Sequence, residues 1–269
     1  PQASPRSNTV EWSGRITHLS ASSTSGVRRA PKSSTSPALS VYDHWTTCVP
    51  CGKIASRAVV RAGQLGAMTV AQIKGITAAD MQVMTVAQAA GLTAAQFVGF
   101  AASEVNALSP SVVSSLSVGQ IAGLTTTQLT SWSAANFQAL TAAQIGAMST
   151  VQFRAINPND IALLTAGQTA GLTNAQISTM TATQLKKLTP TVMGALTAGQ
   201  AGALTATELS SLTTTQINAL GAANIGTLAG AQLAKLTSAQ IAGLNLTNFG
   251  ALTAAQIGAM TATQIKGFS

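Results

Sequence analysis

Hydrophobic residues recur along most of the chain with a period of eight, at alternating spacings of three and five residues. The 208 residues 61–268 divide into 26 consecutive rows of eight without insertion or deletion. The consensus row is Thr-Ala-Ala-Gln-Ile-x-Ala/Gly-Leu, and we number its positions 1 to 8 from the threonine. Position 8 is apolar in every row. Position 5 is Ile, Leu, Val, Met or Phe except at Ala89, Thr169 and Ala201. The array therefore starts at Arg61, and residues 1–60 form a separate segment.

This period fits neither one long helix nor a series of strands. Eight residues of α-helix turn through about 800°, so the apolar pair of each row would move about 80° around the axis and no single face would be buried. A strand half-buried in a sheet alternates apolar and polar residues with period two, which the array lacks. The remaining interpretation is that a new, short helix starts in every row.

The polar positions support that interpretation, because Thr-x-x-Gln is the sequence of a capping box. The threonine hydroxyl accepts the N3 amide, and the N3 glutamine reaches back to the N-cap amide. We expect this arrangement in every consensus row, for example at Thr141 with Gln144 and at Thr253 with Gln256. Position 8 of the preceding row and position 5 are then the residues of a hydrophobic staple.

Proline and acidic residues lie where such helix starts predict them. Every proline of the array is at position 2, the N1 position that tolerates proline: Pro110, Pro158 and Pro190. Every acid of the array is at position 4, inside the first helical turn, where a carboxylate is favoured: Asp80, Glu104, Asp160 and Glu208.

The pattern predicts an all-α solenoid of about 26 eight-residue units, each a very short capped helix. Helices of about five or six residues do not persist alone, because nucleation is costly. Stacked units share one core and stabilise each other. The small residue at position 7 is expected to let the chain bend before the next cap. The pattern leaves open the handedness, and whether two or three units complete one coil.

Composition and charge narrow the range of functions. Of the 269 residues, 46% are hydrophobic and only 7% are charged, against about 25% in typical soluble domains. Residues 1–60 carry seven basic and two acidic residues, a net charge of +5. The array carries seven and four, a net charge of +3. Nucleic-acid binding is not expected, since phosphate contacts need clustered Lys and Arg. A membrane span is not expected either, because polar residues interrupt every row.

The leading segment, residues 1–60, is rich in Ser, Arg and Pro and is expected to be largely disordered, with a helical lead-in at residues 52–60. It holds the only chemically suggestive motif, Cys48-x-x-Cys51 with His44 nearby. The cysteine spacing suits a redox pair, but zinc would need a fourth ligand. The alternative is two incidental free thiols. The array itself has no histidine or cysteine that could activate a nucleophile.

The repeated unit resembles the octapeptide runs of large repetitive bacterial proteins that are often secreted or surface-associated. The resemblance covers residues 61–268 and rests on Leu-Thr-x-x-Gln-Ile-x-Ala/Gly-Leu, as in "LTAGQTAGL" and "LTSAQIAGL". The segment "LTPTVMGAL" (188–196) is also similar to the opening of a TAL-effector repeat, but the second helix and the base-reading loop of that family are lacking. DNA binding is therefore not inferred.

These observations favour a structural or interaction scaffold over an enzyme. We expect a spacer, a fibre or a protein-binding surface, with a protein partner or self-association and without a cofactor or small-molecule substrate. The resemblance favours a secreted or cell-surface location. A regular-surface binder of ice or carbohydrate is the alternative, and a redox or metal protein using Cys48, Cys51 and His44 is a third hypothesis.

Overall fold

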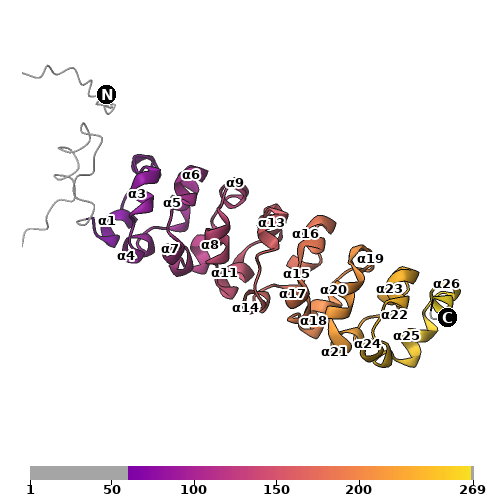
Figure 1. Ribbon diagram of the computed structural model, residues 1–269. Coiled ribbons are helices and arrows are strands. Elements are labelled where there is room, and N and C mark those ends of the chain that lie inside the picture. Colours follow the sequence, from indigo (N-terminus) through magenta and orange to yellow (C-terminus); the bar gives the residue numbers. More distant parts are fainter. Residues whose placement is uncertain (1–59, 268–269) are drawn as a thin grey trace, which may run out of the picture. The chain divides into compact units, whose positions relative to one another are not determined.

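The computed structural model describes residues 60–267, and in that range it consists of 26 short α-helices without a strand (Figure 1). One helix lies in each eight-residue row, so the predicted all-α fold is confirmed. The described residues all belong to the second of two units, Pro1–Asp43 and His44–Ser269. The predicted disordered leader, with its Cys48, Cys51 and His44, lies outside the described residues except for Val60.

Each helix from α1 to α23 packs against the helix three places later in the chain. Three consecutive units therefore complete one coil of the solenoid, which is 3 × 8 = 24 residues, and the helices stack in three columns. Column 1 consists of α1 (Ala62–Gly66), α4 (Val86–Ala90), α7 (Pro110–Ser115), α10 (Ala134–Gln138), α13 (Pro158–Ile161), α16 (Ala182–Lys187), α19 (Ala206–Ser211), α22 (Gly230–Leu233) and α25 (Ala254–Gly258).

The other two columns follow the same rule. Column 2 consists of α2 (Val70–Ile73), α5 (Ala94–Gly99), α8 (Val118–Ala122), α11 (Ala142–Ala147), α14 (Ala166–Thr169), α17 (Pro190–Gly194), α20 (Thr214–Ala219), α23 (Ser238–Ala242) and α26 (Ala262–Lys266). Column 3 consists of α3 (Ala78–Gln82), α6 (Ala102–Asn106), α9 (Thr126–Thr130), α12 (Thr150–Ala155), α15 (Asn174–Ile177), α18 (Ala198–Gly202), α21 (Gly221–Ile225) and α24 (Leu246–Gly250).

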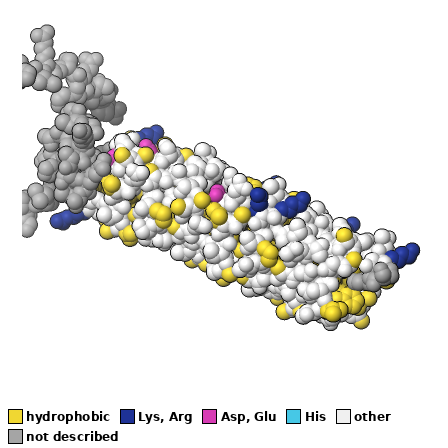
Figure 2. Space-filling view, in the orientation of Figure 1, with side chains coloured by type: hydrophobic (Ala, Val, Ile, Leu, Met, Phe, Trp, Pro, Cys, Tyr) yellow, Lys and Arg dark blue, Asp and Glu magenta, His cyan; other side chains and the backbone are white. Residues whose placement is uncertain are grey.

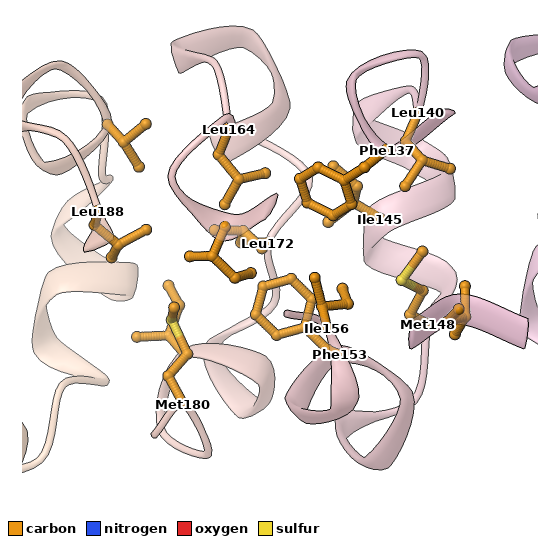
Figure 3. Packing of buried hydrophobic residues seen from close by; sticks show 14 of the residues in the cluster. Phe137, Leu140, Ile145, Met148, Phe153, Ile156, Leu164, Leu172, Met180 and Leu188 are labelled. Atoms are coloured by element: carbon orange, nitrogen blue, oxygen red, sulfur yellow. The ribbon is translucent and has the colours of Figure 1, made fainter. Parts of the chain in front are cut away.

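The core runs along the inside of the three columns and is built from positions 5 and 8. Figure 3 shows side chains of successive units, such as Phe137, Ile145 and Phe153, pointing into one shared interior. Position 5 is fully buried through most of the array, and position 8 is nearly so. The small residues Ala89, Thr169 and Ala201 are also fully buried. The Thr169 hydroxyl donates to the Thr165 carbonyl oxygen at 2.9 Å, so its burial leaves no unpaired donor.

In the structure, position 7 also packs against an adjacent coil, a contact that the sequence pattern did not indicate. Gly221 is the only residue with a positive φ among those described, and the glycines at position 7 have ordinary φ angles, such as −77° at Gly91 and −79° at Gly123. Position 7 instead lies against position 2 of the unit three earlier. A Cβ at Gly171 would overlap the carbonyl oxygen of Ala142, and one at Gly91 would overlap that of Ala62. At Gly91 and Gly171, close approach of adjacent coils therefore requires the small side chain.

Candidate functional site

The most regular polar feature of the array is the hydrogen-bonded start of each helix. In α11, Thr141 Oγ1 accepts the N–H of Gln144 at 3.2 Å, and Gln144 Oε1 accepts the N–H of Thr141 at 2.8 Å. In α25, the same two bonds join Thr253 and Gln256 at 3.2 and 2.8 Å. The N-cap residues Thr141 and Thr253 are extended, as a capping box requires. The position-1 hydroxyl is therefore used within its own unit.

The glutamine of most boxes has a second role that the sequence did not suggest. Gln144 Nε2 donates to the carbonyl oxygens of Val113 at 2.8 Å and Leu116 at 2.7 Å, which lie 31 and 28 residues earlier. These carbonyls belong to the corner between α7 and α8, directly beneath the start of α11 in the stack. One amide group thus caps its own helix with its oxygen and binds the preceding coil with its nitrogen.

This bond to the carbonyl 28 residues earlier recurs through the array, and we call the set of glutamines that make it the glutamine ladder. Its members are Gln88, Gln96, Gln120, Gln128, Gln144, Gln152, Gln168, Gln176, Gln184, Gln200, Gln216, Gln232, Gln240, Gln256 and Gln264. The carbonyl at position 8 follows a helix end and is one that the helix itself cannot pair. The ladder therefore satisfies a corner carbonyl in 15 of the 23 units from α4 to α26.

The ladder explains why position 4 holds glutamine so consistently. A capping box accepts Glu as well as Gln, but only the amide has hydrogens to donate to the preceding coil. At Glu208, which is buried, the carboxylate accepts the N–H of Thr205 at 2.6 Å but supplies no donor to the coil below. The preference for Gln over Glu was the available sequence signal for contact between coils.

Asparagine replaces the ladder glutamine in α10 and α24 with a compensating partner. Asn136 is one methylene shorter than glutamine, and the N–H of its N-cap Ser133 is accepted instead by Asn106 Oδ1 at 2.6 Å. Asn136 Nδ2 then donates to the Asn106 carbonyl oxygen at 2.9 Å. Asn218 and Asn248 repeat the arrangement 112 residues later. The paired replacement keeps both the cap and the bond between coils.

The remaining polar groups of the described range do not form a reaction centre. No three His, Cys, Asp or Glu side chains between residues 60 and 267 lie together in a way that could hold a metal ion. A shallow hollow between the α4–α5 and α7–α8 corners is lined by Thr93, Ser115, Ser117 and Gln120, among others, without a charged group. Burial raises the pKa of the Asp160 carboxyl, which occupies a ladder position without an amide.

Charged side chains are sparse on the face shown in Figure 2. Column 2 has none between Lys74, the C-cap of α2, and Lys266 in α26. Its surface carries exposed valines instead, at Val70, Val98 and Val118. A partner that binds this column would have to recognise it by shape and apolar contact rather than by charge.

Cys48, Cys51 and His44 fall outside the described residues, so the structure does not test the redox and zinc hypotheses. No helix between residues 60 and 267 has both the length and the apolar character needed to cross a bilayer. Comparison with protein families finds no match to this chain. Comparison with curated proteins also finds no significant match. The architecture of the array is therefore the basis for the functional argument.

Proposed function

We propose that this chain is a structural scaffold, a regular solenoid that acts as a spacer or presents a long surface to a protein partner. The observation that carries the proposal is the glutamine ladder, which joins each coil to the one before it from Gln88 to Gln264. Together with the continuous core, it resists bending and separation at each coil boundary. Such regularity suits a protein whose work is done by its length and surface.

The use of the hydroxyl groups also supports a scaffold. In most units the position-1 hydroxyl accepts the N3 amide of its own helix, as Thr141 does. A hydroxyl held as a cap is poorly placed to act as a nucleophile or to match the lattice of ice. The resemblance of the octapeptide to secreted and surface proteins of bacteria favours a role outside the cell.

Deletion of whole coils tests the spacer role. Removing the coil 141–164 takes out 24 residues and keeps every later helix in its column. We expect small-angle scattering of the monomer to show a particle shortened by a fixed increment, and a second deleted coil to shorten it by the same amount. A particle whose length does not follow the number of coils would overturn the proposal.

Deletion of a single unit separates a spacer from a binding surface. Removing 141–148 moves every later helix to the preceding column, while each unit keeps its own cap. A spacer tolerates this change as well as it tolerates the loss of a coil. A partner that reads one column loses its site after the unit deletion but keeps it after the coil deletion. Capture of a partner from the producing cells with both variants makes that distinction.

A further inference from the structure

We infer that the boundary between α5 and α6 is a hinge, the point at which the solenoid resists bending least and opens first (Figure 1). Four features weaken the packing of α6 and α7 on the coil before them: the ladder, the helix caps, the core side chains and a surface hollow. These features coincide at no other step between residues 60 and 267. The hinge gives the scaffold a defined flexible point, and it exists whether or not the array binds a partner.

Two consecutive steps of the ladder are missing at α6 and α7. Their position-4 residues are Glu104 and Val112, and neither a carboxylate nor an isopropyl group has a hydrogen to donate to the preceding coil. The next helix, α8, makes the bond from Gln120 Nε2 to the Leu92 carbonyl oxygen at 2.6 Å. Helices α13, α17 and α19 also lack it, but each stands between two helices that make it. Only at α6 and α7 are two successive steps unbonded.

The same two helices lack the hydroxyl cap that most units have. The N-cap of α6 is Ala101, which has no hydroxyl, and the Ser109 hydroxyl at the start of α7 pairs with that of Ser111 at 3.0 Å instead of the N3 amide. Helices α21 and α22 also lack this cap, but Asn224 and Gln232 still bind the coil before them. From α4 to α26, only α6 and α7 lack both the cap and the bond between coils.

The core side chains at this boundary are small as well. Val105 and Val113 are the only valines at position 5, and nowhere else do two small residues hold this position in consecutive rows. Helix α7 packs on α4, whose position-5 residue is Ala89. Val112 is also buried and offsets part of the loss. A smaller side chain removes less apolar surface from water, so the hydrophobic contribution to this step is reduced.

The surface hollow described above lies on the same boundary. One wall is the α4–α5 corner, with Leu92 and Thr93, and the other is the α7–α8 corner, with Ser115 and Ser117. The two corners are therefore not closed on each other, and the hollow leaves room for them to move. Because fewer contacts hold this boundary, local opening there has a lower free energy than opening elsewhere in the array.

Spin labels on either side of the boundary measure the hinge directly. In the full chain without its two native cysteines, Ala87→Cys in α4 and Ala135→Cys in α10 place labels at exposed positions two coils apart in column 1. Thr207→Cys and Ala255→Cys form the matched pair in the same column, across coils in which every helix binds the coil before it. Double electron–electron resonance should give a wider distance distribution for the first pair.

Hydrogen exchange of the unlabelled chain gives an independent measurement. Residues 173–188 contain α15 and α16, which occupy the same columns as α6 and α7 and keep both caps and ladder bonds. We expect the amides of residues 101–116 to be protected at least about tenfold less than those of 173–188, because two hydrogen bonds between coils are missing.

Restoring the missing bonds should close the hinge. Glu104→Gln with Val112→Gln gives α6 and α7 the donors that their neighbours have, and Ala101→Thr separately restores a cap. Both variants should narrow the distance distribution and raise the protection of 101–116. The matched control makes the same two exchanges at α19 and α17, Glu208→Gln with Val192→Gln, where the caps are intact. It should leave residues 101–116 unchanged. Circular dichroism verifies that each variant is folded.

Equal widths for the two label pairs would overturn the inference, as would equal protection of residues 101–116 and 173–188. It would also be overturned if neither restoring variant changed these measurements, or if the control at α17 and α19 changed them as much. The scattering test of the scaffold role removes coils at 141–164, so its result does not depend on the hinge.

Discussion

Asn248 donates its side-chain amide to both oxygen atoms of Asn218, to the backbone carbonyl at 2.9 Å and to Oδ1 at 3.1 Å. Asn218 Oδ1 also accepts the N–H of Asn245, the N-cap of α24, at 3.0 Å. These bonds replace the cap and the ladder bond that a glutamine makes elsewhere. The two asparagines therefore act together as one hydrogen-bonded pair, although 30 residues separate them.

The Asn218–Asn248 pair predicts strong coupling in a double-mutant cycle. Asn218→Ala alone should destabilise the array by about 1–3 kcal/mol, because it leaves the buried Asn248 and the Asn245 amide with fewer acceptors. Asn248→Gln restores the glutamine that caps its own helix in the other units. Asn218→Ala should therefore cost less in a protein that already carries Asn248→Gln. Chemical denaturation of the four proteins measures the coupling. Strictly additive effects would show that the pair does not act as proposed.

Gln144→Glu tests the ladder separately from the cap. The carboxylate can still accept the Thr141 amide, but it faces the carbonyl oxygens of Val113 and Leu116 without a donor. We expect a loss of about 1–3 kcal/mol in the free energy of unfolding. Gln72→Glu is the control, since the Nε2 group of Gln72 makes no ladder bond, and it should cost much less. The reverse change, Glu208→Gln, should stabilise the protein. Equal costs at Gln144 and Gln72 would contradict the role of the ladder.

Gly171→Ala tests the approach of adjacent coils. The new Cβ would overlap the Ala142 carbonyl oxygen, so the coils must separate and stability should fall by about 1–3 kcal/mol. Gly202 provides the matched control, because a Cβ there meets nothing within 4 Å. Gly202→Ala should stabilise α18 by up to about 1 kcal/mol, since alanine has the higher helix propensity. Thermal unfolding followed by circular dichroism compares the two, and similar shifts would refute the steric explanation.

Two proline substitutions in one unit test the register of the helix start. Thr141→Pro removes the hydroxyl cap, worth about 0.5–2 kcal/mol, and the N–H that Gln144 Oε1 accepts. Ala142→Pro places proline at N1, where Pro110, Pro158 and Pro190 already stand. We expect Ala142→Pro to keep a near-normal helical spectrum and Thr141→Pro to unfold at a lower temperature. Equal damage from both changes would place the helix start elsewhere.

The burial of Asp160 predicts that its contribution to the free energy of unfolding depends on pH. Burial raises the pKa of its carboxyl, so the folded state holds the proton more tightly than the unfolded state. This stabilising contribution is complete below the ordinary pKa of aspartate and is lost as pH rises through the raised pKa. Asp160→Asn should therefore gain stability relative to the parent as pH rises from about 3 to 7. Melting temperatures at both values measure the gain, and a difference independent of pH would contradict the prediction.

Much of the local structure follows from the sequence alone, because it depends on residues within one octad. The capping bonds of Thr141 and Gln144 and the position of proline at N1 involve neighbours at most three residues apart. Side-chain chemistry and helical geometry at that range are sufficient to predict them. The spacing of positions 5 and 8 identified which side chains form the core, although their burial depends on the stacking of coils. The same reasoning placed the start of the array at Arg61 and predicted helices of about five or six residues, whereas the helices observed have four to six.

Only the tertiary structure decided how the units stack. The sequence left open that three units complete one coil. The ladder bond from Gln144 to Leu116 joins residues 28 positions apart, and the contact of Gly171 with Ala142 joins residues 29 positions apart. Every octad has nearly the same local sequence, so no local preference specifies the angle between successive helices. That angle is set by how the side chains of one coil fill the surface of the coil before it, and a contact of that kind exists only after the chain has completed a full turn.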